Sequence, residues 1–359
     1  MPAGLHTTLG ATLAPHFDLG KTRLATLAIM IIGLANGRTV NLSHIASQFP
    51  GAAKHASNYR RLQRFFQYVR LEQDRVAPIV VRMLNLSRPK LLALDRTNWK
   101  VGGKDINILT LAIVTRRFRV PLMWTLLEHR GNSNTKQRIA LMRRYLALFD
   151  ASSIKLLLAD REFIGAQWMD FLNKNNIPFA IRIKAGLRFK PDSGGTWSIS
   201  TLLRKKRARR RALIWKGRLP DADMPLAIAA KRVKSGAWMI IATNTNTPQQ
   251  ALNAYRKRWA IECLFADTKT RGLNIEDTHI TDPLKISTLL TIITLAITWA
   301  YRCATQTMGR AAIRRKTHGR RQKSWFRTGL DTLRNWIINQ PQKAEQAWLS
   351  TCPKYLNTS

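Results

Sequence analysis

The sequence predicts an α/β protein with a mixed sheet, a β-rich insertion, an all-helical N-terminal region and a helical, basic C-terminal tail. Three observations support this prediction. Residues 1–88 carry apolar side chains at helical spacing. From Lys90 onward, short apolar, partly β-branched runs alternate with helical stretches, which is typical of a mixed sheet. The segment 310–359 opens with eight further cations before residue 328.

The N-terminal region contains three clear helical stretches: Leu24–Leu34, Leu42–Phe49 and Tyr59–Val69. A Pro-Gly break precedes the last stretch, which carries three basic residues: Arg60, Arg61 and Arg64. A short helix, a break and a basic helix make up a helix-turn-helix reader of DNA. An ordinary helical hairpin with a solvated basic face has the same pattern, so both interpretations stay open.

We assign residues 89–309 to one domain. Strands are expected at 91–95, 106–114, 120–128, 155–160 and 178–183, and helices at 136–149 and 165–175. A β-rich insertion at about 184–250 interrupts this alternation and contains RKKRARRR (204–211), a run expected to be exposed. Two helices follow, at about 249–272 and about 283–304.

Several protein classes are disfavoured by the sequence. The apolar runs 24–35 and 286–301 are shorter than the roughly 20 residues of a membrane span, so we expect buried helices and no membrane. The N-terminus lacks the pattern of a secretory signal, and the three cysteines lack CxxC spacing. No GxxxxGK[ST] loop is present, so no nucleotide cofactor is expected. We expect a soluble cytosolic protein.

The charge of the chain points to nucleic acid. Sixty lysines and arginines against 20 aspartates and glutamates give a formal net charge of +40. A field of this sign concentrates polyanions. Hydrophobic residues make up 45% of the chain and 11 residues are tryptophan, which excludes a disordered basic tail.

The segment YRKRWAIECLFADTK (255–269) is the most informative of the chain. On one helix, Tyr255, Arg258, Glu262 and Lys269 fall within a sector of about 60°. This face presents a phenol, a guanidinium, a carboxylate and an ammonium over roughly 20 Å. A single acid among cations suits a metal ion next to a phosphate backbone.

Two further acids end apolar strands: Asp95 and Asp160. Carboxylates at the ends of neighbouring strands converge on one sheet edge, and a helix packed there supplies Glu262. Such hard oxygen ligands bind Mg²⁺ or Mn²⁺, and two ions promote phosphodiester chemistry. Asp267 is a poorer third ligand, because its offset places it about 120° from Tyr255.

Each acid also has a plainer interpretation. Asp95 simply terminates a strand in a turn, and Asp160 caps the helix that follows. Glu262 pairs with Arg258 one helical turn earlier as a surface ion pair. Together with the Tyr255–Lys269 row and the net charge, however, the three acids favour a metal site on DNA.

These motifs resemble a known family. Tyr255, Arg258, Glu262 and Lys269 match at every spacing the YREK signature of the insertion sequence four family of bacterial DDE transposases. ALDRTNW around Asp95 and LADREFIG around Asp160 look like its first two acidic motifs. The resemblance spans roughly residues 90–305 and implies a ribonuclease-H-like core interrupted by a β-rich insertion. It also implies that the N-terminal helical region binds the terminal inverted repeats.

The resemblance implies a role for each motif residue. Asp95, Asp160 and Glu262 would hold two Mg²⁺ (or Mn²⁺) ions, while Arg258 and Lys269 grip phosphates and Tyr255 bonds one nearby. Trp238 matches the insertion tryptophan that stacks on a flipped base, although a core role in its strand is the alternative. Trp215 and Trp259 are lesser candidates, and Trp259 is expected to pack its helix against the sheet.

The implied function is cut-and-paste DNA transposition in a bacterial cytoplasm, close to the nucleoid. Cleavage at the inverted repeats, a hairpin intermediate and strand transfer to target DNA would proceed in a homodimer on paired DNA ends. Two rivals remain: a metal-dependent nuclease or resolvase that cuts without joining, and a non-catalytic DNA-binding protein descended from a transposase. A basic RNA-binding protein is a third, which the acidic motifs disfavour.

Overall fold

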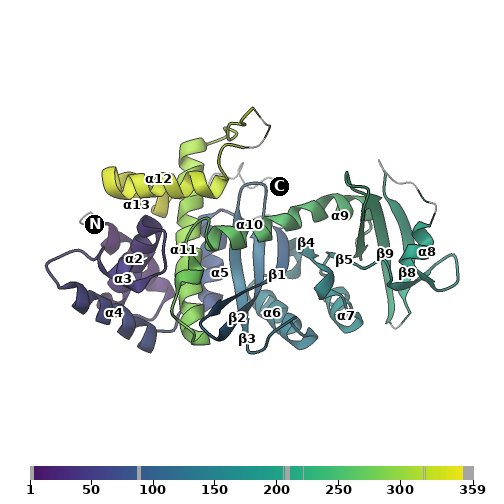
Figure 1. Ribbon diagram of the computed structural model, residues 1–359, viewed down its shortest axis with the longest axis horizontal. Coiled ribbons are helices and arrows are strands. Elements are labelled where there is room, and N and C mark those ends of the chain that lie inside the picture. Colours follow the sequence, from purple (N-terminus) through teal and green to yellow (C-terminus); the bar gives the residue numbers. More distant parts are fainter. Residues whose placement is uncertain are drawn as a thin grey trace.

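The computed structural model describes residues 4–86, 90–204, 206, 211–220, 222–317, 319 and 321–350, with the side chains of 222–223 left out. Most of the basic run 204–211 therefore lies outside the described residues. The molecule is elongated (Figure 1), with the N-terminal helices at one end, the core sheet in the middle and the insertion at the other end.

The described part of residues 1–88 forms helices and no strand, as the spacing of its apolar residues predicts. These elements are α1 (Leu5–Leu13), η1 (Ala14–His16), α2 (Lys21–Gly37), α3 (Leu42–Ala46), α4 (His55–Tyr68) and α5 (Gln73–Met83). The side chain of Asn41 caps α3, and the Pro50-Gly51 break lies in the connection to α4, where Gly51 has a φ of 93°. Helices α3 and α4 contact each other and both contact α2.

Five strands form the centre of the sheet: β1 (Lys90–Val101), β2 (Lys104–Val114), β3 (Arg119–Leu127), β4 (Ile154–Ala159) and β5 (Phe179–Arg182). Their spatial order is β3-β2-β1-β4-β5. Antiparallel pairs join β1 to β2 and β2 to β3, whereas β4 lies parallel to β1 and β5 lies parallel to β4. The predicted mixed sheet is confirmed.

Strand β1 is longer than the sequence predicts, because it does not end at Asp95. It continues to Val101 and pairs with β2 as far as Val101↔Lys104. Alternating Thr97, Trp99 and Val101 suit a strand, and Gly102 supplies the positive φ, 57°, of the following turn. Asp95 therefore lies within a strand and does not terminate one in a turn.

The insertion forms β6 (Arg188–Pro191), β7 (Trp197–Ser198), α8 (Ile199–Leu203), β8 (Leu213–Leu219), β9 (Ala222–Arg232) and β10 (Trp238–Thr243). Its strands continue the core sheet, because β10 pairs antiparallel with β5 and the order runs on as β10-β9-β8-β6-β7. One ten-stranded sheet therefore connects the core to the far end of the insertion (Figure 1).

The chain returns from the insertion through α9 (Pro248–Tyr255), the 3₁₀ turn η4 (Arg256–Arg258) and α10 (Trp259–Thr268). The prediction of one helix over about 249–272 is therefore wrong in two respects. A 3₁₀ turn, which advances about 120° per residue, interrupts it. It also ends at Thr268, because the backbone N–H of Leu273 returns to the carbonyl of Asp267; a Cβ on Gly272 would lie 1.9 Å from that oxygen.

Two more helices connect core strands along the chain: α6 (Thr135–Leu148) follows β3, and α7 (Ala166–Lys174) follows β4. The short 3₁₀ turns η2 (Ala151–Ser153) and η3 (Arg161–Phe163) lie on either side of β4. A capping box of Asn134 and Gln137 begins α6. Helix α6 contacts β3, α5 and α7, whereas α10 contacts β1, β2 and β3. Helix α10 thus crosses β1, the strand that carries Asp95.

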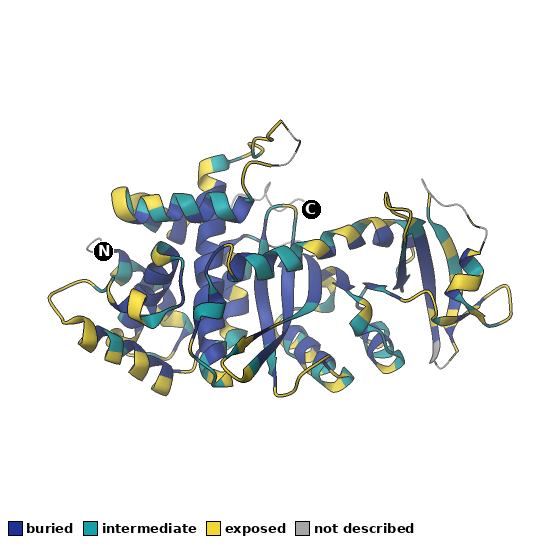
Figure 2. Ribbon diagram, viewed as in Figure 1, coloured by how far each residue is buried: buried dark blue, intermediate teal, exposed yellow. Residues whose placement is uncertain are grey.

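The C-terminal part adds η5 (Ile275–Asp277), α11 (Pro283–Met308), α12 (Trp325–Asn339) and α13 (Pro341–Leu349). By length and composition α11 is able to cross a membrane, but 83% of its most apolar window is buried inside the protein. It contacts α2, α5, α12 and β3, and Figure 2 shows it as almost continuously buried. We therefore interpret α11 as a core helix, as predicted.

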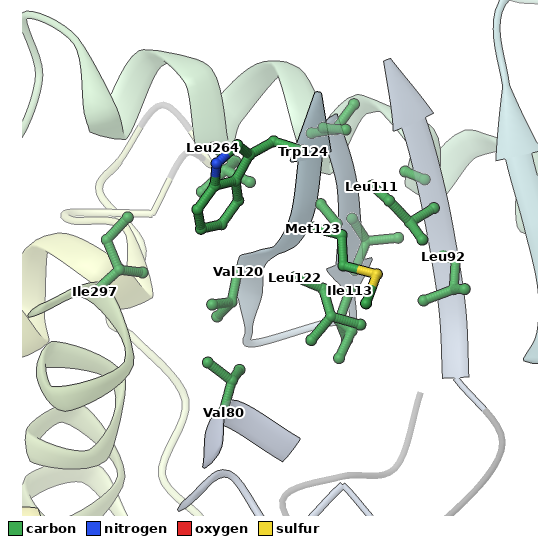
Figure 3. Packing of buried hydrophobic residues seen from close by; sticks show 14 of the residues in the cluster. Val80, Leu92, Leu111, Ile113, Val120, Leu122, Met123, Trp124, Leu264 and Ile297 are labelled. Carbon is green, nitrogen blue, oxygen red and sulfur yellow. The ribbon is translucent and has the colours of Figure 1, made fainter. Parts of the chain in front are cut away.

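The apolar core links these layers. Figure 3 shows Val120, Leu122 and Met123 of β3 close to Ile113 of β2, with Val80 of α5 below them and Ile297 of α11 to one side. Trp124 is 1% exposed and donates its indole N–H to the Ser287 hydroxyl 3.0 Å away. Helix α11 is thereby fixed against the edge strand of the core sheet.

Gly329 offers a test of the α11–α12 packing. A Cβ at this position would lie 1.9 Å from the carbonyl oxygen of Ala300. We expect Gly329→Ala to lower the free energy of unfolding by about 2–3 kcal/mol, since backbone must move. In Gly10→Ala, the new Cβ lies 3.8 Å from Leu24, so stability is expected to stay unchanged or to rise by up to about 1 kcal/mol. Chemical denaturation measures both; equal effects would contradict the packing.

Candidate functional site

Two predicted acids lie side by side on neighbouring parallel strands. The last β1–β4 pair is Leu94↔Ala159, so Asp95 and Asp160 are the next residues on either strand. The buried runs 91–94 and 156–159 fix this register because their side chains fill the core. Two acids that are 65 residues apart in the sequence thus lie next to each other at the end of the β1–β4 ladder.

Helix α10 brings the third acid to this pair through Arg258. The Arg258 guanidinium donates from Nη1 to Asp95 Oδ2 at 2.9 Å and from Nη2 to Glu262 Oε1. Arg258 is only 9% exposed. The pairing of Glu262 with Arg258 that the plain interpretation expected is therefore present, but Arg258 also reaches the sheet and is not a surface residue.

Tyr255 faces the other aspartate. Its phenol donates to Asp160 Oδ1 at 3.4 Å, and the residue is 5% exposed. Burial and the nearby Asp160 carboxylate raise the pKa of Tyr255 well above its usual range, although Arg258 and Arg182 oppose this. The phenol therefore stays protonated and donates. Asp160 itself makes no side-chain bond to cap η3, so the capping interpretation is wrong.

Lys269 lies beyond the end of α10 but still faces β1. Its Nζ donates to the Asn98 carbonyl at 3.0 Å and pairs with Glu276 Oε1 at 2.9 Å. The ammonium also lies 5.9 Å from the centroid of the Trp99 ring. In the Tyr255–Lys269 row, Arg258 and Lys269 thus contact β1 and Tyr255 contacts Asp160, the residue after β4. Glu262 is joined to them through Arg258.

The carboxyl group of Asp95 has an unusual pKa. Burial raises it to about 6, and the neighbouring Glu162 and Asp160 add to the rise, whereas the Arg96 backbone N–H and Arg258 lower it. Burial therefore outweighs the ion pair with Arg258. Burial disfavours the charged form of this carboxyl group, and a nearby positive charge favours it.

The acid and the tryptophans that the sequence analysis also considered lie away from the aspartate pair or face solvent. Asp267 is buried and pairs with Arg119 at 2.8 Å, away from the aspartate pair. Trp259 is 64% exposed, so the prediction that it packs α10 against the sheet is wrong; the 3₁₀ turn before it changes the direction in which it faces. Trp238 lies in the insertion, where the Arg232 guanidinium is 4.6 Å from the centroid of its indole ring. Trp215 is half-buried in β8.

Sequence reasoning missed two charged neighbours of the site. Glu162 pairs with Arg96 at 3.6 Å and raises the pKa of Asp95. Its position two residues after Asp160 was an available signal. Glu276 neutralises Lys269, and nothing in its sequence context marks it.

The donor set fits a divalent cation. Asp95, Asp160 and Glu262 offer hard carboxylate oxygens of the kind that Mg²⁺ and Mn²⁺ prefer. Among the described residues, no three His, Cys, Asp or Glu side chains are already arranged to hold a metal ion. Arg258, which pairs with both Asp95 and Glu262, takes up two of the oxygens.

The strand order β3-β2-β1-β4-β5, with paired aspartates facing a glutamate helix, defines a ribonuclease-H-like α/β fold. Residues 86–299, more than half of the chain, match the family model of the transposase DDE domain. The chain therefore belongs to the DDE transposase family. Membership implies a DNA substrate, and such domains generally use divalent metals. No curated protein matches the chain.

The pKa of Asp95 predicts a pH-dependent stability difference between the wild type and Asp95→Asn. The unfolded chain loses this proton near pH 4 and the folded protein near pH 6. The contribution of Asp95 is therefore most favourable below pH 4 and falls as the pH rises to 6. We expect the stability of Asp95→Asn, relative to wild type, to rise by about 2–3 kcal/mol between pH 4 and 7, measured with a chelator present.

Asp331→Asn is a matched control of opposite sign. Burial raises the pKa of Asp331, but hydrogen bonds from Lys323 and Arg327 outweigh burial and lower this pKa below its usual value. Its contribution is present above the unfolded pKa and lost as the pH falls. The stability of Asp331→Asn relative to wild type should therefore decrease as the pH rises. Parallel curves for Asp95→Asn and wild type would show that the Asp95 pKa is not raised.

Proposed function

We propose that the protein is a cut-and-paste DNA transposase of the insertion sequence four type. It would cleave DNA at the terminal inverted repeats of its element, form a hairpin intermediate and join the freed 3′-hydroxyl to target DNA. The observation that carries this proposal is the contact of the Tyr255–Lys269 row with the aspartate pair: Arg258 to Asp95, and Tyr255 to Asp160. A homodimer on paired ends follows from the need to hold two DNA ends together.

In this proposal Asp95, Asp160 and Glu262 hold two Mg²⁺ or Mn²⁺ ions. When bound, these ions supply Lewis acidity that activates a water or a 3′-hydroxyl and stabilises the leaving oxygen. Tyr255 keeps Asp160 oriented through its phenol, which stays protonated because the Tyr255 pKa is raised. The carboxylates then present oxygens from a rigid sheet, which is the support a precise site requires.

The DNA contacts of the proposal are Arg258, Lys269, Tyr255 and Trp238. Arg258 and Lys269 bear the charge that a phosphate needs, and an arginine fork matches two phosphate oxygens. Trp238 is half-buried and lies against the Arg232 guanidinium, and an aromatic ring at a DNA surface suits base stacking. The alternatives are a nuclease that cuts without joining and a non-catalytic DNA-binding protein.

Glu262→Gln tests the proposal. The substrate is a linear DNA that carries the element's own ends, incubated with a plasmid target and Mg²⁺. We expect wild-type protein to cut at the ends and join them to the plasmid, and Glu262→Gln to lose at least roughly 100-fold in cleavage, since a metal-ligand charge is removed. The matched control is Glu72→Gln, an exposed acid paired with Arg75, which should cut normally.

Each other outcome selects a rival. Cutting without joining indicates a nuclease, and binding without cutting indicates a non-catalytic protein. Equal cleavage by wild type and Glu262→Gln would remove Glu262 from the site.

We further propose that α4 is the element of the N-terminal region that binds DNA. The segment from Leu19 to Leu71 contains eight lysines and arginines and no acid. Helix α4 buries Asn58, Leu62, Phe65 and Phe66. Its exposed face carries Arg60 and Arg64, which make no hydrogen bond or ion pair with the described residues.

Arg61 differs from these two arginines. Its Nε donates to the Thr26 hydroxyl at 2.8 Å and its Nη2 to the Thr22 carbonyl at 3.1 Å. Its guanidinium also lies 5.6 Å from the centroid of the Phe49 ring. Arg61 therefore ties α4 to α2, and only Arg60 and Arg64 remain to meet a phosphate or a base.

The double variant Arg60→Ala/Arg64→Ala separates these roles. We expect its affinity for duplex DNA to fall at least roughly tenfold and the salt dependence of log K to flatten by about 2, one phosphate contact per arginine. Arg61→Ala should instead lower the melting temperature. Lys343→Ala, an exposed cation on α13, controls for net charge. Fluorescence anisotropy over a salt series measures binding; unchanged affinity in the double variant would exclude α4.

A further inference from the structure

Arg258 bonds two carboxylates from different elements at once. Asp95 comes from β1 and Glu262 from α10, and each accepts a hydrogen bond from a separate Nη of the same guanidinium. The side chain is 11% exposed, so water replaces these partners poorly. The planar fork of an arginine holds such an arrangement better than the point charge of a lysine.

This arrangement opposes a metal ion at the same carboxylates. Asp95 Oδ2 and Glu262 Oε1 are two of the oxygens that a divalent cation would use, and both already accept from Arg258. A cation placed there would also lie beside a buried guanidinium, and like charges at close range repel strongly where water is scarce. Arg258 and the cation therefore compete for the same two side chains.

Three of the nearby acids already pair with other cations of the described residues. Glu162 pairs with Arg96, Glu276 with Lys269 and Asp267 with Arg119. Asp160 lies close enough to raise the pKa of Arg258, but it accepts from Tyr255. An anion from outside the chain is a further partner for Arg258, because a phosphate diester matches the fork in the same bidentate way as a carboxylate.

We propose that Arg258 and a divalent cation exclude each other from the metal site. When a DNA phosphate binds the Arg258 guanidinium, Asp95 and Glu262 become free to bind the metal. This inference rests on the proposed function for the identity of the ligands and adds a coupling between DNA and metal binding. Either exchange alone leaves an unpaired charge, whereas both together leave none. Linkage then requires that metal strengthens DNA binding by the same factor.

Binding of Mn²⁺ to the full chain without DNA tests the competition. The signal of free aqueous Mn²⁺ in electron paramagnetic resonance gives the affinity directly and needs no catalysis. We expect Arg258→Ala and Arg258→Gln to bind Mn²⁺ roughly tenfold more tightly than wild type. Arg256→Ala is the matched control, because it removes one exposed cation from the same 3₁₀ turn and should change the affinity little.

The double variant Asp95→Asn/Glu262→Gln identifies the site. It should abolish the tight binding in an Arg258→Ala background. A short duplex that ends at the cleavage site should raise the Mn²⁺ affinity of the wild type roughly tenfold and should raise that of Arg258→Ala less. The Mn²⁺ that the duplex binds in the presence of the double variant is subtracted as background.

The outcomes separate this inference from the proposed function. Unchanged or weaker Mn²⁺ binding by both Arg258 variants, with native circular dichroism, would overturn the competition while leaving the ligands in place. Binding that survives Asp95→Asn/Glu262→Gln would instead place the metal elsewhere and remove the basis of both. Absence of Mn²⁺ binding by the Arg258 variants up to millimolar concentration also contradicts the exchange.

Discussion

The ion pairs of Arg258 determine how the candidate site is assembled. Helix α10 contacts three strands of the sheet, and the residues that flank it, Arg258 and Lys269, donate hydrogen bonds to β1. A buried guanidinium that lost Asp95 or Glu262 would carry an uncompensated charge, which costs far more than an exposed pair contributes. The buried residues Ile261 and Leu264 pack α10 against the sheet, and Arg258 joins Glu262 of this helix to Asp95.

The continuous sheet gives the site a rigid frame. Because β10 pairs with β5, the insertion extends the same sheet that carries Asp95 and Asp160, and α9 returns from it directly into Tyr255. Helix α9 contacts β5, β9 and β10 on the way. A ligand on the insertion strands would therefore meet a surface fixed relative to the acids.

Three acids of this cationic chain form ion pairs at the core sheet. Asp95, Asp267 and Glu276 each pair with a cation on or facing the core sheet. Elsewhere, as on α4, basic residues face solvent without acidic neighbours in the chain segment around them. The positive field is thus left available to DNA, the substrate that membership of the DDE transposase family implies.

The sequence by itself determined the helical N-terminal region, the positions of the core strands and the three acidic motifs, because periodicity, turn residues and helix offsets are local properties. Tertiary structure decided the extension of β1 past Asp95, the union of the insertion with the core sheet and the exposure of Trp259. It also decided which cation each acid meets. Asp95 and Arg258 are 163 residues apart in the chain, and only the packing of α10 across the sheet makes them partners.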